Sequence, residues 1–217
     1  GLIALLARAA GHTKDAERYA AAAQRIKAAF PKTFYNPATG VLAGWKSADG
    51  KLHDYYFTFV AGLASTMGLV PDDMANRVWD RMFAKMRGVG FTDFRLGLPG
   101  NLVPIRREDY VDPAQRVGGS KNEDGSDGFQ YYENGGATAC HVYWTIQGLY
   151  NLKRRADAER ILFPVLDAFE QGAFQGFGPN GKSKDWKRWD GTPGGYEGLL
   201  VDNFLTLLAV HTGYFGK

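Results

Sequence analysis

The chain has 217 residues, of which 26 are basic and 23 acidic, so its formal charge is +3. This length suits one substantial domain, and an apolar content of 45% supports a hydrophobic core. The nearly balanced charge argues against a nucleic-acid-binding protein, which concentrates basic side chains. The single cysteine, Cys140, excludes an internal disulfide framework and a multi-cysteine metal site. No run of about eighteen apolar residues is present, so no membrane span is expected.

The first eight residues are apolar from position 2 onward. They lack the basic head, the apolar run and the cleavage site of a signal peptide. They also lack an initiator Met and a helix cap, so we expect the chain to begin inside a longer protein. The sequence does not indicate a compartment.

A helical period of apolar residues recurs in paired segments along the chain. In the first pair, segment 15–30 spaces its apolar residues four, three and four apart, and Pro31 is expected to end the helix. The second pair, 56–67 and 72–86, is joined by a short turn, and the acidic residues at 72 and 73 suit a helix N-terminus.

The third pair is expected at roughly 137–152 and 156–169, where Pro164 should kink or split the second helix. The last segment, 198–210, carries leucines on nearly every face, so we expect a fully buried helix. Strand-like alternation is almost absent. The sequence therefore predicts an all-α fold built from antiparallel helix hairpins.

The connections alternate between short and long. Three long links, rich in Gly, Pro, Asp and aromatic residues, run roughly over 31–54, 88–136 and 171–196. We call them the first, second and third link. In hairpins laid side by side, this alternation brings every long link to the same end of the stack. A closed ring needs about six hairpins and the chain supplies about three and a half, so we expect either missing upstream residues or another copy as partner.

The links are rich in aromatic and acidic side chains. Aromatic faces stack on the C–H faces of sugars, and carboxylates and amides bond their hydroxyls, so carbohydrate is the expected ligand class. The alternative is that these aromatic residues seal the end of a helical bundle. The most specific segment, 129–137, joins an Asn and a Glu to two glycines and is expected to enter a helix.

Here the chain resembles the second half of the six-hairpin (α/α)6-barrel glycosidases, the group of the trehalases, processing glucosidases and cellobiose-type phosphorylases. The order of four features carries the resemblance: 34–40, 97–102, the loop of Glu133, and 194–198. Trehalases have Gly-Gly-Glu-Tyr where this chain has Gly-Gly-Tyr-Glu. The resemblance implies a single domain, 1–217, that is the C-terminal part of a larger glycosidase catalytic domain.

The resemblance implies the mechanism of the inverting hydrolases of this group: one carboxylic acid protonates the leaving oxygen, and a carboxylate about 6.5–9.5 Å away activates water. The resemblance places the acid upstream of residue 1. It places the base roughly fifteen residues before the last helix, at Asp185, with Glu197 and Asp190 as further candidates. The alternative for Asp185 is a solvated carboxylate among lysines and arginines.

Sugar binding is expected from the other prominent residues of the links. The expected stacking walls are Trp45, Trp186, Trp189 and Tyr196. The expected polar and loop contacts are Glu133, Asn134, Arg95, Tyr132 and Asp54. Asp54 has a second interpretation, favoured slightly, as the N-cap of the helix that follows.

Hydrolysis is not the sole activity that this pattern allows. A phosphorylase would be expected to carry a phosphate-binding His where this chain has Cys140, and His141 points about 100° away along a helix. Hydrolysis is therefore favoured over phosphorolysis, and His141 is expected to pack near Trp144. A non-catalytic sugar-binding or assembly fragment stays open, and so does a sugar lyase on the same toroid.

No metal or cofactor is expected. Segment 122–127 resembles a calcium loop, but the twelfth position of the matching template is Tyr131 instead of Glu. The four histidines show no metal-ligand spacing.

Overall fold

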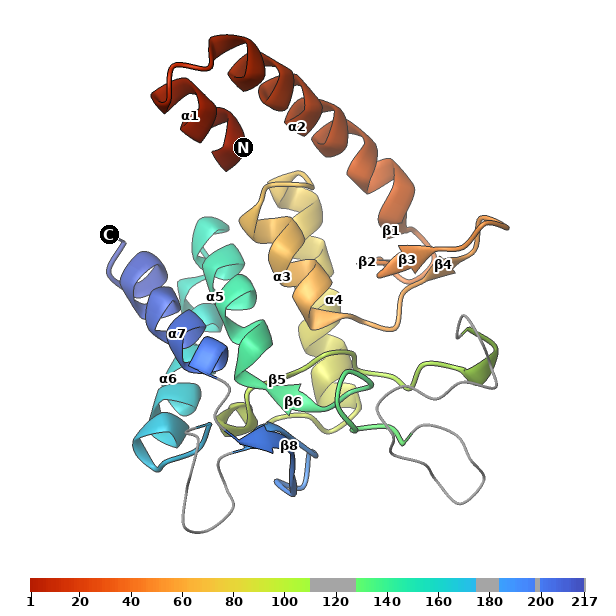
Figure 1. Ribbon diagram of the computed structural model, residues 1–217. Coiled ribbons are helices and arrows are strands. Elements are labelled where there is room, and N and C mark those ends of the chain that lie inside the picture. Colours follow the sequence, from red (N-terminus) through yellow and green to blue (C-terminus); the bar gives the residue numbers. More distant parts are fainter. Residues whose placement is uncertain (110–127, 175–183, 198–199, 217) are drawn as a thin grey trace.

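The structure, a computed structural model, describes residues 1–109, 128–174, 184–197 and 200–216. Within this part of the chain, helices dominate (Figure 1). The α-helices are α1 (Leu2–Ala9), α2 (Thr13–Phe34), α3 (Thr58–Thr66), α4 (Asp72–Gly88), α5 (Val142–Asn151), α6 (Arg155–Glu170) and α7 (Leu200–Ala209), which continues into a π-helical turn (Val210–Tyr214). None of the helices in the described ranges combines the length and hydropathy that a bilayer crossing needs.

In the described ranges, three antiparallel helix hairpins and one further helix follow one another, as the sequence predicts. The pairs are α1–α2, α3–α4 and α5–α6, and α7 packs against α5. Helices α3, α5 and α7 lie side by side in one layer, with α4 behind α3 and α6 behind α5 (Figure 1). Fully buried side chains such as Trp79, Met82, Ile146 and Leu162 fill the space between these helices.

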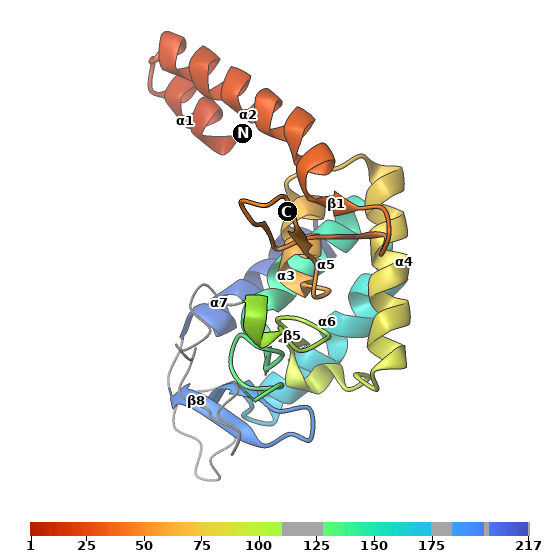
Figure 2. The ribbon, with the colours of Figure 1, turned by 90° about the vertical axis from the view of Figure 1, so that its right-hand side faces the viewer.

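The first hairpin is arranged differently from the others. Helix α2 contacts strands β1 and β3, and the α1–α2 pair projects away from the remaining helices (Figure 2). The apolar side chains Leu2, Leu6 and Ile26 are between 57% and 69% exposed.

Prolines within the described helices do not interrupt them, so the predicted helix end at Pro31 and the predicted split at Pro164 are wrong. Helix α2 continues past Pro31 to Phe34, and the N–H of Tyr35 still bonds to the Pro31 carbonyl. Helix α6 runs unbroken across Pro164. Burial of Ile161 and Val165 on either side of Pro164 holds that helix together although the proline lacks an N–H donor.

Helix α7 is also less buried than expected. Phe204 and Leu207 on this helix are each 65% exposed. Ala209 and Thr206 are the buried residues of its described side chains. Leucines on every face indicate apolar character, but the described contacts of α7 are mainly with α5 and the 3-10 turn that precedes α5.

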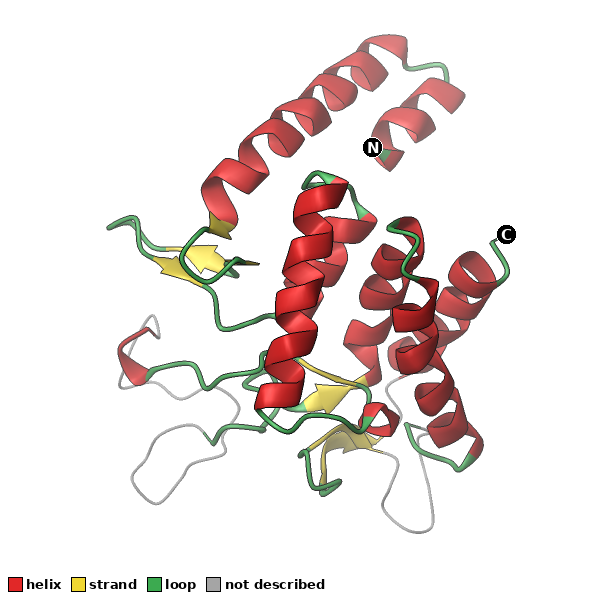
Figure 3. Cartoon of the chain, turned by 180° about the vertical axis from the view of Figure 1, so that it is seen from behind, coloured by secondary structure: helices red, strands yellow, loops and turns green. Residues whose placement is uncertain are grey.

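The fold is mainly helical, as predicted, and short strands occur in the links. They are β1 (Tyr35–Asn36), β2 (Val41–Leu42), β3 (Trp45–Lys46), β4 (Leu52–His53), β5 (Leu98–Pro99), β6 (Ala137–Thr138), β7 (Lys184–Lys187) and β8 (Pro193–Glu197). Figure 3 shows them at the ends of helices and not between them. Strands of two to five residues are too short to show an alternating pattern.

The three links contact one another, as predicted, the second and third through paired strands. An antiparallel sheet in the order β5-β6-β7-β8 unites the second and third links. The segment after the first link joins the second through backbone bonds from Thr58 N–H to the Gly100 carbonyl, 3.0 Å, and from Leu102 N–H to the Tyr55 carbonyl, 3.2 Å.

The glycine-rich segment near residue 135 does not start a helix. It forms strand β6 and a 3-10 turn (Ala139–His141) before α5 begins at Val142. The Thr138 hydroxyl accepts the Cys140 N–H at 3.2 Å and so fixes this turn. The expectation of a helix entry is therefore wrong, and Gly135 and Gly136 instead allow close packing within the loop, against the Phe129 ring and the Tyr132 backbone.

Helices α3 and α5 cross at unusually short range because both carry glycine there. A Cβ at Gly62 would lie 2.7 Å from the Thr145 nitrogen, and one at Gly148 would lie 2.7 Å from the Ser65 Cβ. The backbones can approach this closely only without those side chains.

Gly62→Ala is expected to lower the free energy of unfolding by about 1–2 kcal/mol. Overpacking against backbone costs about 1–3 kcal/mol, while alanine regains up to ~1 kcal/mol of helix propensity. Gly88→Ala on α4 is the matched control, since a Cβ there meets nothing within 4 Å. Urea denaturation of both variants checks the prediction, and equal stability would contradict the close crossing.

Candidate functional site

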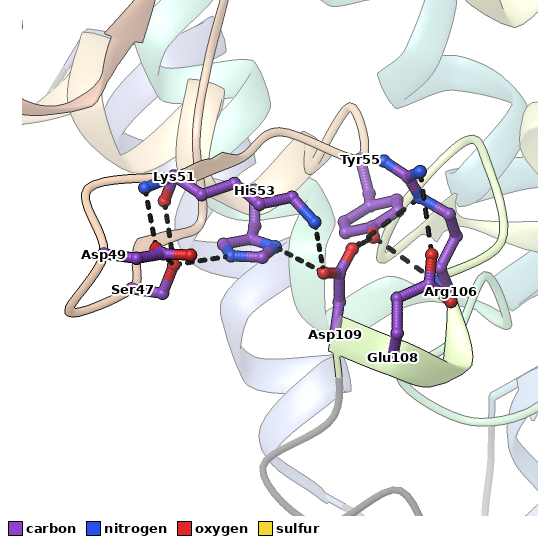
Figure 4. Close-up of polar contacts among 8 residues, drawn as sticks. All are labelled: Ser47, Asp49, Lys51, His53, Tyr55, Arg106, Glu108 and Asp109. Carbon is purple, nitrogen blue, oxygen red and sulfur yellow. Dashed lines mark hydrogen bonds and ion pairs between the residues drawn. The ribbon is translucent and has the colours of Figure 1, made fainter.

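A group of polar side chains ties the β3–β4 hairpin to the second link (Figure 4). We call this group the Asp109 cluster; its members are Ser47, Asp49, Lys51, His53, Tyr55, Arg106, Glu108 and Asp109. Asp109 lies on a 3-10 turn (Arg107–Asp109) and its side chain is 4% exposed. Its carboxylate accepts hydrogen bonds from Lys51 Nζ, at 2.6 Å, and from the Tyr55 hydroxyl.

The electrostatics of the cluster favour an ionised Asp109. Burial alone would raise the pKa of this carboxyl, but the hydrogen bonds from Lys51 and Tyr55 outweigh it and lower the pKa to about 2. Burial and the bond to Asp109 raise the pKa of Tyr55, and the same carboxylate raises the pKa of Lys51. At neutral pH the cluster therefore holds a buried carboxylate between cationic and phenolic donors.

The spatial order of Ser47, His53 and Asp109 matches that of the Ser-His-Asp triad of a serine hydrolase. His53 Nε2 is 3.1 Å from the Ser47 hydroxyl, and His53 Nδ1 is 3.4 Å from an Asp109 oxygen. However, Ser47 bonds Asp49 at 2.5 Å, and His53 Nδ1 forms no hydrogen bond with the residues that the structure describes. The serine is thus not positioned to act as a nucleophile. The Asp109 cluster instead connects the first link to the second.

The Asp109 cluster fixes the orientation of Trp45. The indole stacks on the His53 ring with centroids 4.6 Å apart and planes at 7°, and it also contacts Tyr55 and Phe57 at 5.9 and 5.8 Å. Trp45 is half-buried. These ring contacts hold the indole in a fixed orientation.

Asp109→Asn is expected to remove acid-sensitive stability. Because the folded pKa is about 2 against an ordinary 3.8, Asp109 stabilises the fold above about pH 4, and this contribution is lost as the pH falls from about 4 through 2. The stability gap between wild type and variant should shrink by about 1–2 kcal/mol between pH 5 and pH 2. Urea unfolding at several pH values measures this gap; a constant gap would refute the assignment, and exposed Asp167→Asn serves as control.

The Glu133 loop presents two of the predicted residues to solvent. Gln130 and Tyr132 adopt left-handed conformations, with φ of 67° and 44°. Such strain in residues other than glycine is concentrated at functional sites. Tyr132 is 40% exposed and Glu133 is exposed. The loop therefore holds both side chains outward at a cost in backbone energy.

The Asn134 side chain, in the same loop, is buried and hydrogen-bonded. It is 9% exposed, and its side-chain oxygen accepts bonds from Asn101 Nδ2 at 3.1 Å and from the Ile105 N–H at 3.2 Å. Asn134 thus connects the Glu133 loop to the segment that follows β5.

The β7–β8 hairpin carries Asp185, the first candidate for the base. Its carboxylate is half-buried and lies over Gly195, where any Cβ would collide with it. Gly195 also has a φ of +83°, so both its conformation and the space favour glycine. Asp190 caps the hairpin turn through the Thr192 N–H at 2.8 Å, and this backbone bond lowers its pKa.

The two tryptophans of this hairpin pack inward. Trp186 is 6% exposed and meets the Tyr131 ring at 4.7 Å. The half-buried Trp189 contacts Phe91 and Phe129, and its indole N–H bonds the Gly135 carbonyl at 2.7 Å. Both therefore attach the hairpin to the Glu133 loop, and their proposed contact with sugar stays a prediction.

Two further predicted residues lie in separate surroundings. Arg95 forms a two-bond ion pair with Asp93, at 2.8 and 2.7 Å, beside a cleft of about 240 Å³ near Lys187 and Gly191. Asp54 accepts bonds from the side chains of Asn36, at 2.9 Å, and Thr39. The N-cap interpretation of Asp54 is wrong, because α3 starts at Thr58 with Phe57 as its N-cap.

His141 packs on Phe59, with ring centroids 5.2 Å apart, whereas Trp144 contacts Tyr143. The expected packing near Trp144 is thus corrected. Burial lowers the pKa of His141 to about 4, so it is neutral at pH 7. The Cys140 sulfur lies 3.9 Å from its Nδ1.

Some predicted features lie outside the described residues. The backbones of Tyr196 and Glu197 belong to β8, but their side chains are not described. The calcium-like segment 122–127 is not described either. Within the described ranges, no group of three or more His, Cys, Asp or Glu side chains could hold a metal ion.

Sequence reasoning missed the central role of Asp109. Trp45, His53 and Tyr55 belong to the aromatic-rich first link and its end, but Asp109 is one charge in the segment Arg106 to Asp109. Nothing in the spacing links it to a hairpin more than fifty residues earlier. The only signal was the general concentration of acidic residues in the links.

A comparison with known families bears on this arrangement. Residues 1–151 match the model of the bacterial alpha-L-rhamnosidase six-hairpin glycosidase domain. The chain belongs to this family. The resemblance to six-hairpin glycosidases is thereby confirmed, and the member that matches is the rhamnosidase domain. No curated protein matches the chain.

The matched part of the rhamnosidase domain includes Trp45, the Asp109 cluster and the Glu133 loop. The β7–β8 hairpin with Asp185 follows the matched residues. Membership supports a glycosidase-type function for the chain.

Proposed function

We propose that the chain contributes to an inverting glycoside hydrolase that acts on α-L-rhamnosides. The substrate class comes from the name of the matching family. The mechanism comes from the resemblance to inverting six-hairpin enzymes. The observation that carries the proposal is the junction of the Glu133 loop with the β7–β8 hairpin, through the contact of Tyr131 with Trp186.

This junction brings candidate groups of two kinds into one region. Tyr132 and Glu133 face solvent on a strained loop, and Asp185 lies on the adjoining hairpin. Strand β6, which follows the loop, pairs with β7. Rhamnose is a deoxysugar with a methyl group, so it needs apolar walls as well as hydroxyl partners, and Trp45 and Tyr132 are suited to the first role.

In the proposed reaction Asp185 takes a proton from a water molecule as that water attacks the anomeric carbon. A carboxylic acid on the opposite side of the sugar donates its proton to the leaving oxygen. Glu133 accepts hydrogen bonds from hydroxyls of the cleaved sugar. Glu197 and Asp190 are the further candidates for the base.

The test uses the natural protein that contains this sequence. It should release nitrophenol from p-nitrophenyl α-L-rhamnoside, and not from the corresponding α-glucoside. Proton NMR of the first turnover should show the β anomer of rhamnose, since inversion changes the anomeric configuration. First formation of the α anomer would refute inversion, and rhamnose binding without turnover would favour a non-catalytic sugar-binding fragment.

A further inference from the structure

A cleft of about 550 Å³ lies between the β1–β2 turn and helix α4, apart from the residues assigned to catalysis. Its lining includes Tyr35, Pro37, Tyr56, Arg77, Asp80 and Arg81. The volume falls in the range of small-molecule sites, about 300–1,000 Å³. Two phenol rings and two guanidinium groups thus share one concave surface.

The β1–β2 turn forms one wall of the cleft, and side-chain hydrogen bonds hold this turn in place. The Asp54 carboxylate accepts bonds from Asn36 and Thr39, on either side of the cleft residues Pro37 and Ala38. The Ala38 N–H bonds the Asn36 side chain at 3.0 Å. These bonds make the wall a fixed structure and give Asp54 a role in building it.

Arg81 reaches across the turn because residue 40 is glycine. A Cβ at Gly40 would lie 3.4 Å from the Arg81 Cγ and Nε, and Gly40 has a φ of +76°. The stem of Arg81 therefore packs on the turn and its guanidinium is kept at the cleft.

Tyr56 faces this cleft through a strained backbone. Its φ is +57°, and its N–H bonds the Asp54 carbonyl at 2.6 Å in a three-residue turn. This conformation costs about 1–3 kcal/mol in a residue other than glycine. With this backbone conformation the two neighbouring tyrosines belong to different sites. Tyr56 lines the cleft, and Tyr55 bonds Asp109. Lys85 lies 5.1 Å from the centre of the Tyr56 ring.

The charges of the cleft do not balance. Asp80 is paired with Arg154 at 2.8 Å, and Arg77 is paired with Asp73 at 2.8 Å. Arg81 has no ion pair or hydrogen bond with any residue in the described ranges. The Arg81 guanidinium thus remains available for an anion.

We propose that this cleft binds an acidic sugar residue, with its carboxylate on Arg81 and its ring against Tyr35 and Tyr56. Guanidinium pairs with carboxylate through two parallel hydrogen bonds, and phenol rings stack on sugar rings. The inference rests on the proposed function only in taking a saccharide as ligand. It makes acidic glycans the substrate class that the cleft selects.

The test measures binding and needs no turnover. Isothermal titration of the natural protein with digalacturonic acid should show binding, whereas the neutral digalactose should bind at least about tenfold more weakly. Arg81→Ala should weaken digalacturonate binding at least about tenfold, which corresponds to the loss of one ion pair. Arg87→Ala is the matched control, because Arg87 is exposed on the same helix and does not line the cleft.

Three results would overturn the proposal. They are equal affinity for the acidic and neutral disaccharides, unchanged affinity in Arg81→Ala, and binding of inorganic phosphate at Arg81 without binding of digalacturonate. Thermal unfolding of Arg81→Ala is measured alongside binding, so that a folding defect from the lost packing of its stem is distinguished from a binding defect. Hydrolysis of p-nitrophenyl α-L-rhamnoside is measured separately, so failure of the proposed function is distinguished from failure at the cleft.

Discussion

Asp185→Asn should lower kcat for α-L-rhamnoside hydrolysis by about 10²–10⁴-fold, the usual contribution of a general base. Asparagine has nearly the same shape but cannot take the proton from the attacking water. Because Asp185 is proposed to act on water and not to hold the sugar, KM should change little. Steady-state kinetics with p-nitrophenyl α-L-rhamnoside measure both constants in the natural protein.

Two further variants make this prediction specific. Asp167→Asn replaces an exposed carboxylate on α6 and should leave kcat unchanged. Asp190→Asn tests the other carboxylate of the same hairpin, whose bond to the Thr192 N–H gives it a capping role. Full activity of Asp185→Asn with loss in Asp190→Asn or Glu197→Gln would move the base to that residue.

Gly97→Ala is expected to destabilise the protein by about 3 kcal/mol or more. Gly97 has φ of 86° and ψ of −144°, a region that only glycine adopts freely. A Cβ there would collide with the Thr138 carbonyl and lie 2.8 Å from the Ala139 nitrogen. Both atoms belong to the backbone at β6, so no side-chain rotation relieves the clash, and β5 would separate from β6.

The control for this change is Gly90→Ala. Gly90 has a similar φ of +81°, but a Cβ there meets nothing within 4 Å. Its replacement should cost only the conformational strain, about 1–2 kcal/mol. Thermal unfolding should therefore show a melting temperature several degrees lower for Gly97→Ala than for Gly90→Ala. Equal melting temperatures would show that β5 and β6 are not packed as described.

The outcome at Gly97 also concerns the candidate site. Strands β5 and β6 hold the second link against the β7–β8 hairpin, which carries Asp185. A shift of β5 should therefore reduce activity as well as stability. The remaining activity of Gly97→Ala at low temperature, where the protein is still folded, separates the two effects.

Much of the helical framework is determined by the sequence itself. The period of apolar residues in 72–86 and 156–169 predicts α4 and α6, because one helix face must be buried whatever its neighbours are. The alternation of short and long connections predicts that the links meet at one end, because antiparallel hairpins allow no other arrangement. The loop motifs carry the family resemblance.

Only the tertiary structure decided how the link residues are used. Asn134 and Trp189 are of residue types that commonly contact sugars. In the structure Asn134 bonds Asn101, and Trp189 bonds the Gly135 carbonyl. Asp109 accepts hydrogen bonds from Lys51 and Tyr55 and so connects two links. Arg81 lies at the cleft because Gly40 leaves room for its stem. Helical periodicity is local and can be read along the chain, whereas these contacts join residues from distant segments, whose distances are set only when the whole fold forms.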